Sequence, residues 1–240
     1  MTGLREALRA GWSGDGVTHV MPALRAARAV PPGARLLHLR TVPPVLAFSR
    51  RDALRPGFAA AEEVAAVHGF APLVRHVGGS FAPLHEGSLV VDLYGTSPDA
   101  SRGSVARFEE SAAALRGLLV RLGLDARVGA VPGEYCPGEH SVNVAGRVKV
   151  AGIAQRVSGQ AWLVSSVVQV HGAPALRAVT RAVAGALGAE VDPATVGDLA
   201  SAGLDLDVEE LASCVEEAFV EARLVRAGDV VVEVAGAPGR

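Results

Sequence analysis

The basic residues of this 240-residue chain are almost all arginine. Among 23 lysines and arginines, the only lysine is Lys149, in the segment GRVKVAGIAQR. Arginine keeps the positive charge, but it lacks the compact ammonium with three donors and does not lose its proton near neutral pH. The surviving lysine therefore indicates a site that needs a point-like donor or a titratable amine. The alternative is a chance remnant on a solvated strand.

A cysteine that lies 13 residues earlier is a candidate for the same site. Cys136 stands in GEYCPGEH, between Gly133 and Gly138 and directly before a proline. A residue before proline favours extended backbone, and the two glycines allow a tight, exposed turn. The thiolate is the nucleophilic form of cysteine, and a nearby ammonium favours it. We interpret Cys136 as a candidate nucleophile assisted by Lys149, with a harmless loop thiol as the alternative. Cys214 has the pattern of a residue in the core or at its edge.

A glycine pair is the third feature that could serve chemistry. Gly78 and Gly79 lie in RHVGGSFAPLHEG, between two expected strands, and Arg75 and His85 flank them. Glycines let backbone amides approach a ligand closely and point at a developing negative charge, although an isolated pair is more often an ordinary turn. The seven histidines show no spacing typical of metal ligands, so we expect no metal site.

The composition argues against several classes of protein. Apolar residues make up 50% of the chain and charged residues 20%, as in globular proteins, and 240 residues fit one large domain. The formal net charge of -2 argues against a general binder of nucleic acids or anionic membranes. No apolar run approaches the ~20 residues that span a bilayer. Two cysteines and an N-terminus without a signal-like apolar segment favour a cytoplasmic location.

Hydrophobic periodicity and turn residues predict strands and helices that do not alternate strictly. We expect a short helical piece after Asp192 and helices at residues 4–12, 57–69, 101–123, 174–188 and 207–225. Serine at the start of 101–123 predicts a side-chain cap there. We expect a ladder over 140–170 with turns at 145–146 and 158–159, and strands at 34–40, 43–50, 71–77, 87–95, 125–131 and 229–234. The pattern favours an α+β fold in a single domain, with a mixed, largely antiparallel sheet flanked by helices.

These segments together resemble the lipoate–protein ligase and octanoyltransferase superfamily, which shares its catalytic fold with biotin protein ligases. RHVGGSFAPLHEGSL is similar to the Arg-x-x-Gly-Gly loop signature of that family and the histidine that follows it. GRVKVAGIAQR is similar to its Gly-x-x-Lys-x-x-Gly-x-x-Gln segment, in which Lys149 stands at the active-site lysine. The resemblance covers roughly residues 36–170. We therefore expect one catalytic domain over 1–240, with this core at 34–173, an N-terminal helical extension at 1–33, and C-terminal helices and a last strand at 174–240.

The resemblance also implies which residues form the site. The chain is most similar to the branch in which a loop cysteine ahead of the lysine strand carries the acyl group, which implies that Cys136 and Lys149 are catalytic. Ser80 and Ser88 stand where the ATP-dependent ligases usually carry a glycine and an asparagine. The implied reaction requires no cofactor, and it uses ATP only if the chain is a ligase. The implied substrate-binding residues are Arg75, Gly78, Gly79, Ser80, His85, Gly152 and Gln155.

The implied reaction is acyl transfer. An octanoyl or lipoyl group would move through a cysteine thioester to a lysine of a lipoyl-accepting domain, such as that of a 2-oxoacid dehydrogenase or of the glycine cleavage H protein. The donor would be acyl carrier protein or a lipoylated protein, and neither nucleic acid nor a membrane is expected as a partner. Two alternatives are an ATP-dependent lipoate–protein ligase and a non-catalytic protein that binds acyl carriers or lipoyl domains. Candidates for lining an acyl tunnel, each of which could equally be core, are Val150, Ile153, Ala154, Leu73 and Phe81.

Overall fold

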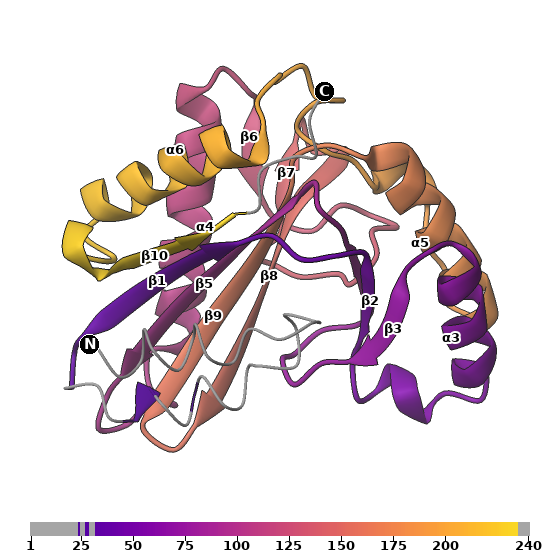
Figure 1. Cartoon of the computed structure of the whole chain (residues 1–240), viewed down its shortest axis with the longest axis horizontal. Coiled ribbons are helices and arrows are strands. Elements are labelled where there is room, and N and C mark those ends of the chain that lie inside the picture. Colours follow the sequence, from indigo (N-terminus) through magenta and orange to yellow (C-terminus); the bar gives the residue numbers. More distant parts are fainter. Residues whose placement is uncertain (1–23, 25–26, 29–31, 235–240) are drawn as a thin grey trace.

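The computed structural model describes residues 24, 27–28 and 32–234 (Figure 1). The helix expected at 4–12, most of the extension expected at 1–33, and the tail after residue 234 lie outside the described residues.

A seven-stranded sheet forms the body of the molecule (Figure 1). Each strand runs antiparallel to its neighbour except at one edge, where β10 pairs in parallel with β1. The sheet is therefore mixed and largely antiparallel, as the sequence predicted. In spatial order its strands are β10 (Val230–Glu233), β1 (Arg35–Arg40), β5 (Ser88–Thr96), β9 (Ala161–Gln169), β8 (Val148–Ser158), β7 (Val142–Val144) and β6 (Ala126–Val128).

A smaller sheet and two pairs of helices complete the part of the fold that the structure describes (Figure 1). The small sheet has the order β3 (Ala71–Val74), β2 (Val45–Phe48) and β4 (Ala82–Leu84), and helices α3 (Phe58–Val67) and α5 (Ala173–Leu187) lie beside it. Helices α4 (Ser104–Arg121) and α6 (Val208–Glu221) cover one face of the large sheet. Short 3-10 turns occur at η1 (Asp52–Leu54), η2 (Pro193–Thr195) and η3 (Ala227–Asp229). The predicted α+β class is confirmed.

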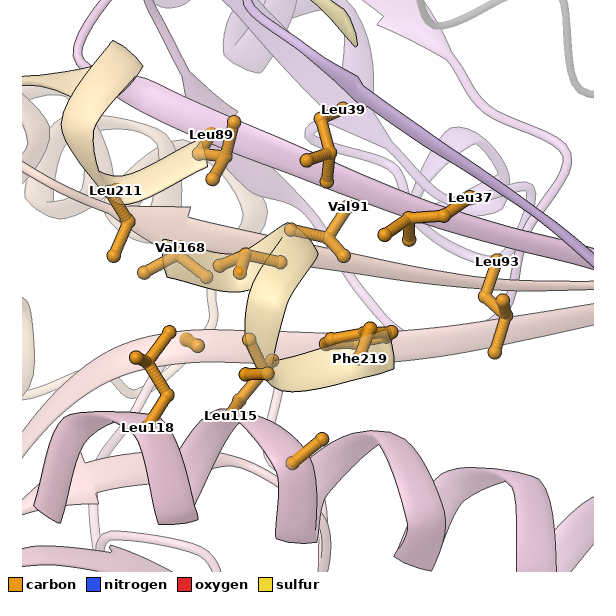
Figure 2. Close-up of a cluster of buried hydrophobic side chains, with 14 of the residues drawn as sticks. Leu37, Leu39, Leu89, Val91, Leu93, Leu115, Leu118, Val168, Leu211 and Phe219 are labelled. Atoms are coloured by element: carbon orange, nitrogen blue, oxygen red, sulfur yellow. The ribbon is translucent and has the colours of Figure 1, made fainter. Parts of the chain in front are cut away.

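Alternation along the central strand distributes its side chains between separate cores. Leu89, Val91 and Leu93 of β5 point to the face covered by α4 and α6 and pack with side chains of those helices (Figure 2). Val90, on the opposite face, joins the core of the small sheet, and Tyr94 joins a third cluster. Successive side chains of a strand point to opposite faces, so a strand buried on both faces can serve two cores.

The prediction from the sequence placed one helix cap wrongly and missed one strand. Helix α4 begins after Gly103, which has a φ of 73°, and no side chain caps it, so the predicted serine cap is wrong. The hydroxyl of Ser101 bonds to the carboxylate of Asp99 instead. Strand β4 has only three residues, too few to show alternation, and it forms because β2 offers a free edge for pairing.

Two connections and one strand of this fold carry the residues that the sequence singled out. The loop between β6 and β7 contains Cys136, and Lys149 is the second residue of β8. The two strands β7 and β8 are joined at the predicted turn, where Ala145 and Gly146 both have positive φ. The glycine loop that contains Gly79 connects β3 to β4 of the small sheet. The large sheet thus presents the amine and the thiol, and the small sheet presents the glycines.

Candidate functional site

Cys136 and Lys149 line the same cavity, which lies between the two sheets and has a volume of about 70 Å³. The sequence predicted this proximity from the unusual residue types together with the family resemblance. Of the implied substrate-binding residues, Arg75, Gly79 and Gly152 also line this cavity. Its other lining residues are Ala82, Tyr135, Pro137, Gly138, Ser141, Ile153, Ala154, Ser165, Val167 and Gln169.

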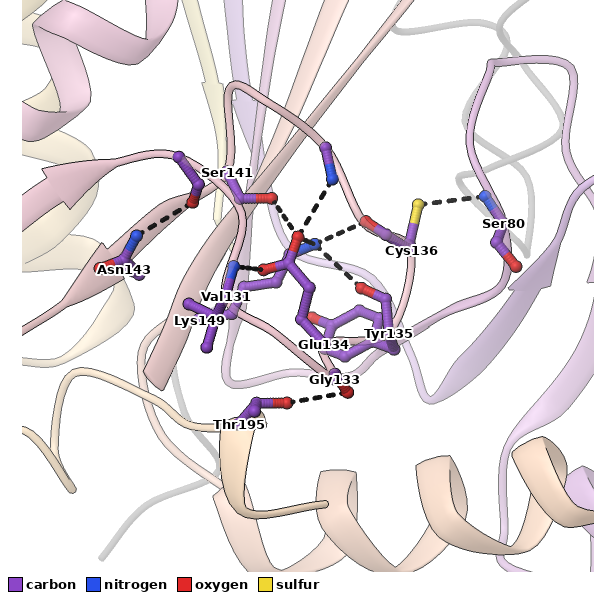
Figure 3. A network of polar contacts seen from close by, with 12 residues as sticks. Ser80, Val131, Gly133, Glu134, Tyr135, Cys136, Ser141, Asn143, Lys149 and Thr195 are labelled. Atoms are coloured by element: carbon purple, nitrogen blue, oxygen red, sulfur yellow. Dashed lines mark hydrogen bonds and ion pairs between the residues drawn. The ribbon is translucent and has the colours of Figure 1, made fainter. Parts of the chain in front are cut away.

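The ammonium of Lys149 binds the backbone of the cysteine loop (Figure 3). Its Nζ donates to the carbonyl oxygens of Cys136, at 2.8 Å, and of Tyr135, at 3.0 Å, and lies 3.4 Å from Oε1 of Glu134. The side chain is only 2% exposed. Burial lowers the pKa of Lys149 below its ordinary value of 10.5, and the negative charges of Cys136 and Glu134 oppose that effect. Three acceptors converge on one nitrogen, which suits an ammonium better than a planar guanidinium.

Cys136 differs from the sequence expectation in its backbone. It was expected to be extended and exposed, but it is half-buried and has a φ of 48°, in the left-handed region. Non-glycine residues seldom adopt this region unless the surroundings fix them. Here the Cys136 carbonyl is held by Lys149 and its sulfur by the glycine loop, so contacts at both ends of the residue override the preference of a residue before proline.

Two donors face the sulfur of Cys136. The backbone N–H of Ser80 donates to Sγ at 3.0 Å (Figure 3), and Nη2 of Arg75 lies 3.8 Å away. Gly79 has a φ of 100°, and a Cβ added there would lie 2.6 Å from Sγ. The glycine is therefore required both for its backbone conformation and for the close approach of the sulfur. Both donors stabilise negative charge on the sulfur.

The glycine loop is clamped from both sides. Arg75 donates from Nη2 to the carbonyl of Ser80 at 2.7 Å, and the Ser80 hydroxyl donates to Oδ1 of Asp52 at 3.0 Å. Asp52 is buried, and its other oxygen accepts from the backbone and hydroxyl of Ser49. These bonds direct the N–H of Ser80 at the sulfur. The sequence did not mark Asp52, because its position beside the loop depends on how the small sheet folds.

Glu134 is a second site residue that the sequence did not mark. Its side chain is 0% exposed, and its carboxylate accepts from the N–H of Val131 at 3.2 Å, the N–H of Gly138 at 3.1 Å and the hydroxyl of Ser141 at 2.8 Å (Figure 3). It also faces Lys149. An acidic residue in an irregular loop shows no periodic signal of burial, so the sequence pattern could not identify it.

A wider cavity of about 430 Å³ adjoins the inner one, since both are lined by Gly79, Pro137, Gly138, Ile153 and Ala154. Gly78 and Gln155 lie here and do not line the inner cavity. Both ends of the Gln155 amide are occupied: Oε1 accepts from Arg107 at 2.7 Å, and Nε2 donates to the carbonyl of Ser104 at 3.0 Å. The remaining lining residues are Ser104, Phe108, Glu139, His140 and Val157.

Some candidate residues lie elsewhere. His85 lines neither cavity; its Nδ1 accepts from the N–H of Gly87 and its ring packs against His171. Burial lowers the pKa of His85. Of the five acyl-tunnel candidates, Ile153 and Ala154 line both cavities. The other three, Val150, Leu73 and Phe81, pack in hydrophobic cores.

Two further observations concern the whole described part of the chain. Within it, no group of three or more histidine, cysteine or acidic side chains could hold a metal ion. None of its helices combines the length and the apolar character needed to cross a bilayer. Cys214 packs against the edge of the core under α6, as the sequence predicted.

Comparison with known proteins gives one relative by sequence. No protein-family model matches the chain. An octanoyl-[GcvH]:protein N-octanoyltransferase from Exiguobacterium sibiricum is 33% identical over 109 residues, which are 44% of this chain and 38% of that protein. The match thus spans well under half of the relative.

Solved structures give a longer match. A lipoate-protein ligase A bound with ATP superposes with a TM-score of 0.66 at 19% identity, over 88% of this chain and 81% of that chain. A bi-partite lipoate protein ligase from Thermoplasma acidophilum, described together with its E2 lipoyl domain, gives 0.60 at 19% identity, over 88% and 79%. The chain has the fold of the lipoate–protein ligases. This fold and the partial sequence match to an octanoyltransferase agree with the resemblance noted from the sequence.

Proposed function

We propose that this protein is an acyltransferase that moves an octanoyl or lipoyl group, through a thioester on Cys136, to a lysine of a lipoyl-type domain. The observation that carries the proposal is the environment of the sulfur. Sγ lies at a cavity, 3.0 Å from the N–H of Ser80 and 3.8 Å from Nη2 of Arg75. A thiolate with such donors is a competent nucleophile for an acyl carbonyl.

The proposed reaction has two half-reactions. The Cys136 thiolate attacks the carbonyl carbon of the donor. With an acyl thioester, the bond to the donor sulfur breaks and the donor leaves as a thiolate that takes up a proton. With an acyl-lysine amide, the C–N bond breaks and the lysine amine leaves with a proton taken from solvent, so this first step is uphill. The neutral amine of the acceptor lysine then attacks the enzyme thioester, an amide bond forms, the Cys136 thiolate leaves, and the amine proton passes to solvent. Thioester exchange is close to thermoneutral and the amide is more stable than a thioester. The reaction therefore needs no ATP and no cofactor.

The neighbouring groups have distinct roles in this proposal. The N–H groups at Gly78–Ser80 would stabilise the oxyanion of each tetrahedral intermediate, and losing one such donor typically lowers kcat about 10²–10³-fold. Arg75 would hold the loop through the Ser80 carbonyl. Lys149 would hold the backbone of Cys136 so that the sulfur faces these donors.

The two adjoining cavities would hold the acyl chain. The inner cavity of about 70 Å³ has room for about two waters, because each water occupies about 30 Å³ in the liquid. It is therefore too small for the eight carbons of an octanoyl chain. The chain would therefore extend beyond the inner cavity, past Ile153 and Ala154, which line both cavities. Each buried methylene contributes about 0.8 kcal/mol, so a chain of this length gives enough affinity to anchor the substrate.

The acceptor is proposed to be a lipoyl-type domain. Support for this acceptor comes from the Thermoplasma ligase that was described with its E2 lipoyl domain. The name of the sequence relative specifies octanoyl-GcvH as its donor, which supports a protein of this kind as a donor. The donor is proposed to be acyl carrier protein or a lipoylated protein.

A transfer assay tests the proposal. The wild-type chain is mixed, without ATP, with a lipoyl domain and either octanoyl-acyl carrier protein or an octanoylated H protein as donor, and the lipoyl domain is analysed by mass. We expect an octanoylated domain, and no product with Cys136→Ala. In a parallel arm the donor is octanoate with ATP. Product only in that arm, with Cys136→Ala fully active, would identify an ATP-dependent ligase instead. Lack of product in both arms, with the lipoyl domain still bound, would point to a non-catalytic binding protein.

A further inference from the structure

The cysteine loop is folded around a buried carboxylate, that of Glu134. Its two oxygens accept from the N–H of Val131, the N–H of Gly138 and the hydroxyl of Ser141, at 2.8–3.2 Å. These groups come from the start, the middle and the end of the loop (Figure 3). The same carboxylate faces Lys149 at 3.4 Å. Glu134 thus connects the whole loop to the amine.

Lys149 needs a counter-charge because it is buried. The titratable or charged groups that face it are Glu134, Cys136, Arg75 and Tyr135, whose ring centroid lies 4.8 Å from Nζ. Arg75 is a cation and opposes the ammonium, and the Tyr135 phenol stays neutral because burial raises its pKa. Only Glu134 and Cys136 can supply negative charge among these four groups.

The charge of Cys136 changes during the proposed reaction. It is present as long as the sulfur is a thiolate, and it disappears when the sulfur carries an acyl group. In the acyl-enzyme, Glu134 is the one anion left among the groups that face Lys149. The ammonium has three donors for three oxygens, those of the Tyr135 and Cys136 carbonyls and of Glu134. A neutral amine would keep only two uncharged, weaker donors and turn its lone pair toward the third oxygen. A loss of the proton would therefore weaken the hold on the backbone of Cys136 halfway through the cycle.

We propose that Glu134 is a positioning residue that keeps Lys149 protonated while Cys136 carries the acyl group, so that the thioester stays fixed for attack by the acceptor amine. The proposal rests on the acyl-transfer function proposed above and adds a role for a residue that does not touch the substrate. Glu134 acts through Lys149 and through the loop backbone.

The single lysine of the chain makes a direct test possible. Protein labelled with ¹³C at lysine gives one Cε signal, and its shift is followed as the pH is raised. Cys136 is first alkylated with iodoacetamide, which removes its charge as acylation does. In Glu134→Gln we expect the midpoint of this titration to fall by about one pH unit or more relative to wild type, a tenfold or greater loss of proton affinity. Ser141→Ala removes one bond to the same carboxylate without changing charge, and its midpoint is expected to stay within a few tenths of a unit.

The outcomes separate this inference from the function on which it rests. An unchanged midpoint in Glu134→Gln would overturn the role of Glu134, whatever the enzyme transfers. If Glu134→Gln does not fold, Glu134→Asp is used instead, because its shorter side chain moves the carboxylate away from Lys149. A lowered midpoint of the Lys149 titration then supports the proposal, and an unchanged midpoint overturns it. In single-turnover assays, Glu134→Gln is expected to slow transfer from the acyl-enzyme to the lipoyl domain more than it slows acylation. Equal slowing of both steps at all pH values would also contradict the proposal. An absence of any acyl-enzyme in wild type would instead refute the proposed function.

Discussion

Two ion pairs of this fold are buried to nearly the same extent but hold different kinds of backbone. Lys149 and Glu134 are 2% and 0% exposed, and Arg40 and Asp92 are 6% and 1% exposed. In the second pair, Nε and Nη2 of Arg40 both donate to Oδ2 of Asp92, at 3.0 and 2.9 Å. In the first pair the ions are 3.4 Å apart, and the ammonium makes its shorter bonds to backbone carbonyls.

The difference lies in what each pair holds. Arg40 and Asp92 join β1 to β5, whose backbones already pair regularly over six residues. Lys149 and Glu134 hold an irregular loop in which Cys136 has a left-handed φ beside a cavity. Burial of charge therefore does not by itself mark a functional site. The informative feature is a buried charge that orders irregular backbone next to a candidate nucleophile.

Breaking the strand-to-strand pair is expected to have the largest effect on stability. Asp92→Asn removes the negative charge that faces the Arg40 guanidinium, and loss of one partner of a buried pair typically destabilises by about 3–5 kcal/mol. Urea unfolding should show this loss in the free energy of unfolding. The rate at which iodoacetamide alkylates Cys136 in the folded variant should match wild type. A variant as stable as wild type would contradict the structural role of this pair.

Replacing the ammonium of the other pair by a guanidinium is expected to affect catalysis more than stability. Lys149→Arg keeps the charge, but its planar guanidinium does not reproduce bonds to three converging acceptors, and the side chain is confined by Gly152, where an added Cβ would lie 3.3 Å from Lys149 Cε. We expect octanoyl transfer to fall about 100-fold, a change of about 2.7 kcal/mol in the barrier. Unfolding should change less than in Asp92→Asn. Unchanged turnover would refute the argument built on the single lysine.

Two glycines with positive φ, one in the candidate site and one outside it, allow a matched comparison of alanine substitutions. Gly79→Ala forces a Cβ to 2.6 Å from the sulfur of Cys136, whereas at Gly69, which also has positive φ, an added Cβ meets nothing within 4 Å. Both substitutions pay backbone strain of about 1–3 kcal/mol. Only Gly79→Ala is expected to slow acylation, by about tenfold beyond any effect of Gly69→Ala, in a single-turnover assay. Equal rates in the two variants would show that the close approach of the sulfur does not matter.

Residue types that are rare in this chain pointed to the candidate site. The lone lysine and the cysteine between glycines marked two candidate residues, and the family resemblance implied that they share one site. Strand alternation with the turn at Ala145–Gly146 predicted the hairpin that carries the lysine. Such local patterns predict structure correctly because they follow from backbone preferences and side-chain periodicity.

The residues that the sequence missed depend on contacts between distant segments. Asp52 belongs to the site because the small sheet brings it to Ser80, and Glu134 because its loop folds back on β8. The backbone of Cys136 was mispredicted for the same reason: bonds from Lys149 and Ser80 override its local preference. His85, which the family resemblance suggested, lines neither cavity because it packs against His171. Local pattern does not encode any of these contacts.

The central claim is that the sulfur of Cys136 accepts the acyl group. The direct measurement is the intact mass of the protein after separate incubations with octanoyl-acyl carrier protein and with an octanoylated H protein, each in the absence of a further acceptor. The account predicts one added octanoyl group on the wild-type chain and on Cys214→Ala, and none on Cys136→Ala. A wild-type chain that gains no octanoyl group from either donor, or a Cys136→Ala chain that still gains one, would contradict it.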